Sequence, residues 1–438
     1  MGRHVIVPPF EKRLQERYVT LVQSHVGGGH LASGIHAPPE AASSLAATQA
    51  AYRFFHNPKV TLRGLAAPLV QFAAAEVSRV CDRYVLVVHD WSPVSLPKHT
   101  RKKDRISLSQ RRVPEGYELQ AALAVSDRDG LPMAPLSIGL RAADGVHCSR
   151  SWKVREPLSP LDELDPAMRH VEGLKLPKPT VHVIDAEADS VAHYRLWSAQ
   201  PGRLYLVRCD DRLVEHAGVQ RKCSVIQQEL RSAGQLQFTR DVQYHGRPAK
   251  QFVAEVPVRL LRPGQRNRTQ GGIDRQRVRG QPLPLRLVIS EVRADDGTLL
   301  ATWLLLTNAP AEVDPATIAL WYYWRWSIEE FWKLLKSAGL QLEDWRQDSA
   351  GAMARRLLVG CMACALVWRL ARSEHPDAAP ARRLLVRWSG RQMRRGVEFT
   401  LPALLAGLWV LLAMMDALES HEPEELRRLA DVALGRPP

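Results

Sequence analysis

The sequence predicts an α/β fold in which a central sheet is flanked by helical regions at both ends of the chain. Residues 84–90 and 180–185 are short apolar runs that each close on an aspartate, and such runs are typical of central strands buried on both faces. Between residues 236 and 306, strand-type segments follow one another without a long helical pattern. After residue 306 the pattern is helical. With 438 residues, the chain is long enough for two or three domains.

The amino-terminal part is expected to be all-helical. We predict one helix near residues 14–23 and another over about 44–56, separated by a glycine-rich break at 27–30. Asn57 and Pro58 end the second helix, because a proline disfavours helical backbone at the residue before it. We therefore place a helical region at residues 1–70, ahead of the first strand.

The middle of the chain is expected to form the sheet. Further strands are predicted at residues 118–125, 136–140, 204–207, 252–260, 285–289 and 299–306. Residues 262–279 are rich in glycine, glutamine and arginine, a composition typical of a mobile basic loop. We expect one domain over residues 71–375 with a β-rich insertion at about 215–306, followed by a helical region at 376–438 that could support dimerisation.

The apolar segments give no reason to expect a membrane protein. The longest apolar stretch, residues 402–415, stops at Asp416 and is shorter than the roughly 18–20 residues that a membrane span requires. We expect a buried helix there, packed either in its own core or against a second copy. Cys361 and Cys364 lie in an apolar helical run, which favours core packing over zinc or redox chemistry. Six scattered cysteines and no signal peptide fit a cytoplasmic location.

The charge balance favours a polyanionic partner. Lysine and arginine outnumber aspartate and glutamate by 60 to 46, giving a net charge of +14. A GC-rich genome would explain the preference for arginine over lysine, but it would not explain the net charge. One arginine cluster without an acidic residue is a candidate phosphate-binding surface, and its members are Arg382, Arg383, Arg387, Arg391, Arg394 and Arg395.

Two aspartates are candidate metal ligands. Asp90 and Asp185 end the two predicted central strands, and the carboxyl ends of such strands are where an α/β sheet places its reactive groups. With a third carboxylate they could hold two divalent metals about 4 Å apart, which is the arrangement used in phosphoryl transfer. Hard oxygen ligands select Mg²⁺, with Mn²⁺ as a possible substitute. The alternative is that each aspartate only caps the turn that follows it.

Helix geometry selects the third carboxylate. If residues 322–336 form one helix advancing about 100° per residue, four polar side chains share a stripe about 60° wide: Tyr322, Arg325, Glu329 and Lys336. Lys333 lies beside this stripe, whereas Glu330 lies off it. The apolar face lies opposite and contains Trp324, Ile328, Phe331, Leu334 and Leu335. The alternative is a solvated face of ion pairs between residues four apart.

The spacing Tyr322-x₂-Arg325-x₃-Glu329-x₆-Lys336 resembles the signature of the insertion-sequence-four family of DDE transposases. The resemblance extends to residues 303–307, to residues 185–189 and to residues 50–58. It implies a ribonuclease-H-like core in which Asp90, Asp185 and Glu329 bind two metal ions. The β-rich segment would be the family's insertion, which agrees with Glu329 following Asp185 by 144 residues.

The resemblance also implies roles for other residues. Tyr322 and Arg325 would hold transposon-end DNA near a flipped base, with Lys336 on a phosphate and Lys333 as a further phosphate contact. Trp303 would help to open the DNA end, although a tryptophan in a strand could equally belong to the core. Arg53 is a candidate DNA contact on the amino-terminal helix.

The implied function is a cut-and-paste transposase acting as a homodimer on transposon-end and target DNA, through a hairpin intermediate. The alternative is a non-catalytic DNA-binding repressor or inhibitor derived from a transposase.

Overall fold

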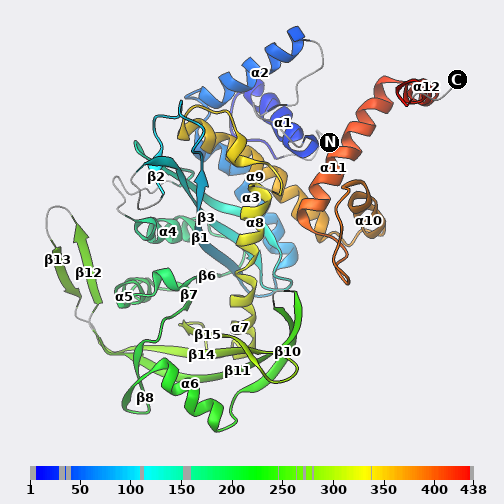
Figure 1. The fold of residues 1–438 in the computed structure, drawn as a ribbon. Helices are drawn as coiled ribbons and strands as arrows, with labels where there is room; N and C mark the ends of the chain where they lie inside the picture. The colour runs from blue at the N-terminus through cyan, green and yellow to red at the C-terminus, as the bar shows by residue number, and fades with distance from the viewer. Residues whose placement is uncertain are drawn as a thin grey trace. The chain divides into compact units, whose positions relative to one another are not determined.

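The computed structural model describes residues 6–28, 35, 41–108, 113–150, 159–244, 246–262, 264–269, 273–278, 281–336 and 338–434. The chain forms two compact units, each built from separate stretches of sequence (Figure 1). Unit 1 comprises Met1–Gln71, Val94–Tyr117 and Glu329–Pro438, and unit 2 comprises Phe72–Pro93 and Glu118–Ile328. Two helices cross the boundaries between these stretches, α3 (Leu62–Val80) and α8 (Ser327–Leu335). The large mixed sheet and the helices at both ends confirm the expected α/β class.

Unit 1 is mainly helical and is built around one buried helix. Its helices are α1 (Lys12–Gly27), α2 (Ala41–His56), α9 (Ala350–Ala371), α10 (Ala378–Trp388), α11 (Leu401–Ser420) and α12 (Pro423–Ala433). Small and apolar side chains cover almost every side of α9, so that α1, α2 and α11 can all pack on it. Cys361 and Cys364 are fully buried in α9, as expected of core residues.

A buried arginine joins α1 to α9. The guanidinium of Arg356 lies 3.9 Å from the centre of the Trp345 ring and donates to Gln347 Oε1 over 2.9 Å. Its Nε also lies 3.3 Å from Nε2 of His25, which belongs to α1. Burial, followed by the charge of Arg356, lowers the pKa of His25 to about 3. His25 is therefore a neutral acceptor at neutral pH, and the amino-terminal helix is held by a specific polar contact.

The carboxyl-terminal helix α11 is longer than the apolar stretch suggested. It continues past Asp416 to Ser420, because an aspartate does not by itself end a helix. Among the described residues, α9 and α11 are both long and apolar enough to cross a membrane, although α9 is mostly buried in the unit. Only the start of α11 is buried, and Gly407 there packs directly against the backbone of Leu385 in α10. Met414 and Met415 are exposed.

Unit 2 contains most of a large mixed sheet with the strand order β5-β4-β3-β1-β6-β7-β15-β14-β11-β8-β9. Its strands are β1 (Val85–Ser95), β3 (Pro114–Ser126), β4 (Pro132–Ala142), β5 (Gly145–Cys148), β6 (Thr180–Ile184), β7 (Leu204–Arg208), β8 (Leu213–His216), β9 (Val219–Lys222), β10 (Gln237–Tyr244), β11 (Arg247–Leu260), β14 (Leu283–Arg293) and β15 (Leu299–Thr307). The pairings β1–β6 and β6–β7 are parallel, and β15 continues the sheet antiparallel to β7. The expected strands are therefore confirmed.

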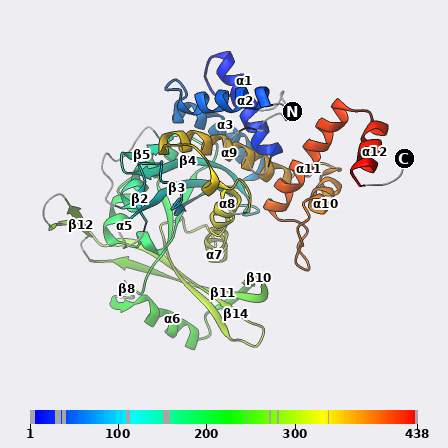
Figure 2. The same ribbon diagram turned by 45° about the horizontal axis from the view of Figure 1, so that its top comes forward.

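Helices cover both faces of this sheet. They are α4 (Leu164–Gly173), α5 (Val191–Ser198), α6 (Cys223–Ser232) and α7 (Pro315–Trp324). Figure 1 shows α4 and α5 on the side of the central strands opposite to α7. Figure 2 shows α6 beside the long strands β11 and β14, where Ile226 and Leu230 join the core cluster formed with those strands. The helix α6 lies inside the segment expected to be β-rich and was not predicted.

The interval 262–279 is not a loop in its described residues. It forms the hairpin of β12 (Gly264–Thr269) and β13 (Ile273–Val278). The flanking strands β11 and β14 are paired as far as Leu260 and Leu283, so the chain between them begins and ends in antiparallel alignment. Arg195 also donates to the carbonyls of Leu260, Arg262 and Gln281 at the base of the hairpin. Composition alone was therefore a poor guide here.

Residues 322–336 do not form one continuous helix. The chain turns between α7 and α8, where the Arg325 and Trp326 amides donate to residues three positions earlier. Ser327 donates to the carbonyl of Gly130 over 2.7 Å, which ties this turn to the connection between β3 and β4. Trp324 lies so close to Gly130 that an added Cβ would be 2.3 Å from its ring. The single-helix prediction was wrong for this reason, and Lys336 lies just beyond the end of α8.

Candidate active site

Parallel pairing places Asp90 and Asp185 side by side. The register aligns Val88 with Val183 and His89 with Ile184, so the next residue of each strand is an aspartate. Asp185 directly follows β6, as predicted, whereas β1 continues to Ser95 beyond Asp90. The carboxylates are partly exposed, with 18% of the Asp90 side chain and 26% of the Asp185 side chain accessible. Solutes can therefore reach them.

Backbone hydrogen bonds fix the two aspartates. Oδ1 of Asp90 accepts from the amide of Trp91 over 2.9 Å. Oδ1 of Asp185 accepts from the amide of Ala186 over 2.7 Å and so caps the short helix η2 (Ala186–Ala188). The capping role considered for Asp185 is therefore present, and it orients the carboxylate beside Asp90.

Asp189 anchors the turn that carries Asp185. Its side chain is fully buried and accepts hydrogen bonds from the hydroxyl of Tyr194, from the amide of Asp210 and from the guanidinium of Arg212. Because Asp210 follows the end of β7, these bonds tie the turn after β6 to the chain after β7. The backbone around Asp185 is consequently fixed.

Two arginines and a tyrosine converge on the aspartates. The guanidinium of Arg325 lies 3.2 Å from Oδ2 of Asp185 and 3.9 Å from Oδ2 of Asp90. Nε of Arg208 lies 2.8 Å from Oδ1 of Asp185. The hydroxyl of Tyr322 donates to the same oxygen over 3.1 Å. Tyr322 and Arg325 thus share a target although the helix turns between them, and Arg208 was missed.

Glu187 is a further carboxylate in this neighbourhood. Burial raises its pKa, and the negative charges of Asp90 and Asp185 raise it further. Glu187 lies within residues 185–189, which carry part of the resemblance, but no role was predicted for it. Its place in the turn after a central strand was the available signal, as was the place of Arg208 at the end of the adjacent strand β7.

The aspartate pair suits a divalent cation. Carboxylate oxygens are the preferred ligands of Mg²⁺ and Mn²⁺. The side chains of Asp90 and Asp185 already hold one positive group, the guanidinium of Arg325, between them. The two carboxylates therefore attract positive charge, and in this structure Arg208 and Arg325 supply it. Among the described residues, no group of three or more acidic, histidine or cysteine side chains is arranged as a metal site.

Aromatic residues extend the site along α7 and β15. Trp303 is partly exposed, and its ring centre lies 5.7 Å from that of Tyr322 and 6.5 Å from that of Tyr323. It also packs against the small core cluster of Val242 and Val292. Trp303 is therefore partly a core residue and partly accessible.

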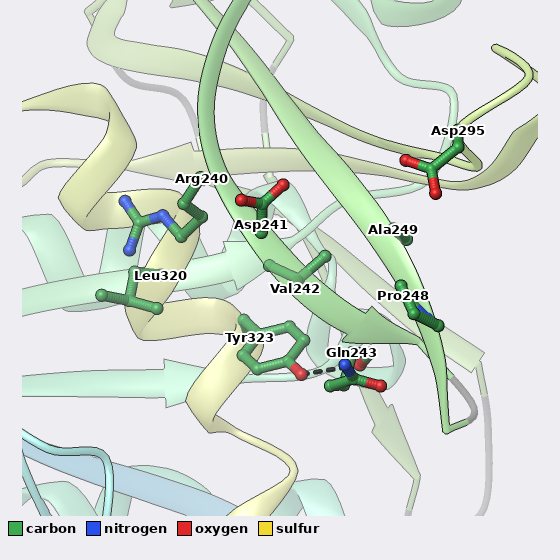
Figure 3. Close-up of a pocket in the computed structure, with 9 residues that line it drawn as sticks. All are labelled: Arg240, Asp241, Val242, Gln243, Pro248, Ala249, Asp295, Leu320 and Tyr323. Carbon is green, nitrogen blue, oxygen red and sulfur yellow. Dashed lines mark hydrogen bonds between the residues drawn. The ribbon is translucent and has the colours of Figure 1, made fainter. Parts of the chain in front are cut away.

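A cavity of about 490 Å³, lined in part by Tyr323, lies between the β10–β11 hairpin and α7 (Figure 3). The hydroxyl of Tyr323 donates to the carbonyl of Gln243 over 2.8 Å at its wall. Polar groups are contributed by Arg240, Asp241 and Asp295. The cavity is thus amphipathic.

The other predicted site residues lie in unit 1. Glu329 is in the first turn of α8 and is half-buried. Lys333 is exposed, and its Nζ lies 2.6 Å from Oε1 of Glu330. Lys336 is half-buried after the end of α8. Arg53 is exposed on α2. The structure therefore brings Asp90, Asp185, Tyr322 and Arg325 together, with Trp303 against Tyr322.

Most of the arginine cluster in unit 1 is exposed. Arg383 and Arg387 are solvent-accessible on α10, as are Arg391, Arg394 and Arg395 after it. Arg382 instead packs over the ring of Phe399 and lies 3.7 Å from Glu398. Five of the six predicted residues thus present a basic surface.

A buried histidine pair lies on the opposite face of β1 and β6. Nε2 of His89 lies 2.8 Å from Nδ1 of His182, and Nε2 of His182 lies 3.5 Å from Oε1 of Glu172. Burial lowers the pKa of both histidines, and for His89 the charges of His182, Arg150 and Arg203 lower it further. Burial opposes ionisation of Glu172, but bonds to His182 and Arg203 bring its pKa to about 2. On this face the neutral pair of His89 and His182 therefore lies next to the ion pair of Glu172 and Arg203.

The comparison with known proteins agrees with the amino-terminal prediction. Residues 11–60 match the family model described as transposase DNA-binding. The match covers α1 and α2, includes Arg53, and contains residues 50–58, which carried part of the resemblance. It supports a transposase, with DNA as its partner. No curated protein matches the chain.

The matched segment is an integral part of unit 1. Arg355 of α9 donates to the carbonyls of Phe55 and Val60, at the end of the segment. Asp348 accepts from the hydroxyl of Tyr52 and lies 2.6 Å from Nε2 of His56. Through these bonds, the DNA-binding segment is attached to the carboxyl-terminal helices.

Proposed function

We propose that the protein is a DDE transposase of the insertion-sequence-four type, which cleaves transposon ends and joins them to target DNA. One observation carries the proposal: adjacent parallel strands place Asp90 and Asp185 together, beside the Tyr322 and Arg325 side chains of the signature. The transposase DNA-binding match supports delivery of DNA to this protein. The ribonuclease-H-like identity of the core is part of the proposal.

The proposed catalytic set is Asp90, Asp185 and Glu329. Two Mg²⁺ ions, or Mn²⁺ in their place, would activate water or a 3′ hydroxyl and stabilise the leaving oxygen during strand cleavage and transfer. Asp90 and Asp185 would hold them, because both carboxylates are accessible and fixed by backbone amides. Glu329 is the proposed third ligand, on the strength of the signature spacing.

The remaining residues would bind DNA. Tyr322 and Arg325 would contact the end near a flipped base, Trp303 would stack against that base, and Lys336 and Lys333 would contact phosphates. Arg53 and the exposed arginines of α10 would add phosphate contacts in unit 1. The hairpin intermediate, the homodimer and the cytoplasmic location also remain proposals. Exposed Met414 and Met415 on α11 suit a contact with a second copy.

The test is metal-dependent cleavage. Full-length protein is incubated with Mg²⁺ and duplexes carrying the element's terminal repeats, taken from DNA flanking the coding region, and products are separated on denaturing gels. Nicked and hairpin products that disappear with Glu329→Gln, while DNA binding persists, would support the proposal. Unchanged cleavage by Glu329→Gln would exclude this triad, and sequence-specific binding without cleavage would favour the repressor.

A further inference from the structure

The two aspartates accept hydrogen bonds from backbone amides, whereas the arginines that face them approach on long side chains. Asp185 is fixed by the amide of Ala186, and its turn is anchored through buried Asp189. The Arg208 side chain is 40% exposed on a long flexible stem. The Arg325 side chain is less accessible, at 11%, and it reaches Asp185 and Asp90 from the turn between α7 and α8. A change of partner at this site would therefore move the guanidinium groups and leave the carboxylates in place.

The arginines and a divalent cation compete for the same oxygens. Oδ1 of Asp185 already faces three donors, namely the Ala186 amide, the Tyr322 hydroxyl and Nε of Arg208. Oδ2 faces Arg325, which also approaches Asp90. A cation bound at Asp185 would lie within a few ångströms of two positive guanidinium groups, and like charges at that distance repel one another. Arginine and cation are therefore alternative partners of Asp185.

DNA supplies a competing partner for these arginines. A phosphate presents the planar guanidinium with paired oxygen acceptors, as a carboxylate does, and arginine binds both through parallel hydrogen bonds. A phosphate that accepted Arg208 and Arg325 would uncover the oxygens of Asp185 and would remove positive charge from the cation's surroundings. The exchange needs no rearrangement of the sheet.

We propose that Arg208 and Arg325 block divalent-cation binding at Asp90 and Asp185 in the free protein, and that DNA phosphate draws them away. Cation binding then follows DNA binding, which prevents metal-dependent chemistry before a substrate is in place. This inference rests on the proposed function and adds an order of assembly to it. The coupling is reciprocal, so the cation also tightens DNA binding by the same factor.

The experiment measures Mn²⁺ affinity by electron paramagnetic resonance of the full-length protein, alone and with a duplex that the protein has selected from a random pool. The Asp90→Asn/Asp185→Asn double variant is titrated in parallel to subtract Mn²⁺ bound by the DNA itself. We expect DNA to raise the aspartate-dependent affinity about 5- to 150-fold, the usual range for coupled sites. The same samples are run on a gel to record cleavage.

Arginine variants test the cause of the coupling. Arg208→Gln and Arg325→Gln should each raise Mn²⁺ affinity in the DNA-free protein, by roughly tenfold or more if a neighbouring positive charge is the obstacle. Arg259→Gln is the matched control, because Arg259 pairs with Glu215 elsewhere in unit 2, and it should leave Mn²⁺ affinity unchanged.

The outcomes separate this inference from the proposed function. Equal aspartate-dependent affinity with and without DNA, in samples that cleave DNA, would overturn the ordered binding and leave the transposase proposal standing. A DNA effect with unchanged affinity in both arginine variants would overturn the role of the arginines. Absence of both aspartate-dependent Mn²⁺ binding and cleavage, with or without DNA, would overturn both proposals.

Discussion

The two faces of the β1–β6 strand pair place ionisable groups in opposite situations. On one face, Asp90 and Asp185 are partly exposed and face positively charged arginines. On the other, His89 and His182 are buried and neutral, with Glu172 behind them. Because side chains alternate along a strand, neighbours one residue apart, His89 and Asp90, belong to different environments. Charged groups at accessible ends can exchange partners, whereas buried neutral groups only stabilise the fold.

The first prediction is that a substitution on the aspartate face affects DNA cleavage and leaves stability nearly unchanged. Asp185→Asn should reduce DNA cleavage by at least about a thousandfold, the scale found for residues that act as one catalytic unit. Stability should change little, because asparagine can still accept the Ala186 amide and the position is partly exposed. Cleavage rates and thermal unfolding of the same preparation provide the measurement. Cleavage at the wild-type rate would show that Asp185 is not a catalytic residue.

The second prediction concerns the histidine face. His182→Ala should lower the free energy of unfolding by about 2–4 kcal/mol, because it leaves a cavity and removes the partner of His89. Below the unfolding temperature, cleavage should be retained within a few-fold. Denaturant unfolding and cleavage assays would show this. A severe loss of cleavage in a fully folded variant would mean that the two faces are coupled.

The third prediction concerns the pH dependence of folding stability that the buried histidines should cause. Both histidines have pKa values below the ordinary 6.5, so the unfolded chain binds protons that the folded chain excludes. Stability is therefore retained above pH 6.5 and lost as pH falls below it, by up to about 1.4 kcal/mol per pH unit for each neutral histidine. Glu172, whose pKa is lowered to about 2, adds its own loss only below pH 4.5.

The range between pH 4.5 and 6.5 consequently excludes the contribution of Glu172, although His25, whose pKa is also lowered, contributes there. Unfolding free energies measured across this range should have a steeper slope for the wild type than for His89→Gln/His182→Gln, since the double variant lacks these two imidazoles and the contribution of His25 is common to both proteins. Equal slopes would show that the pair does not control acid stability.

The sequence allowed the strand ends to be predicted because burial on both faces imposes an uninterrupted apolar run. That pattern located β1, β6 and β7, and hence Asp185 at a strand end. It placed Arg208 at a strand end but could not place it beside Asp185, because strand order, which makes β7 the neighbour of β6, depends on long-range pairing. The break at Arg325 also depends on a distant contact between Ser327 and Gly130. Local periodicity is blind to such contacts.

The hairpin β12–β13 is a second case in which long-range pairing determined the structure, here by forming strands where a loop was predicted. Residues 262–279 have the composition of a mobile loop, but their described residues form a hairpin because the long strands β11 and β14 on either side are paired. The helix α6 was not predicted, because the segment around it is dominated by strand-type patterns. Pairing over long sequence separations therefore determined the secondary structure of this segment, which local composition did not predict.

The smallest expected effect belongs to the Tyr322 hydroxyl. Tyr322→Phe removes one donor to Oδ1 of Asp185 but leaves the Ala186 amide and Arg208 in place, so cleavage should fall roughly tenfold, or ~1.4 kcal/mol. The ring contact with Trp303 is kept, so DNA affinity should change less than the rate. Single-turnover rates and binding measured on one duplex would separate the two. If affinity falls instead and the rate is unchanged, Tyr322 contributes only to DNA binding. The Asp185 carboxylate is then oriented by the Ala186 amide and the arginines without help from the Tyr322 hydroxyl.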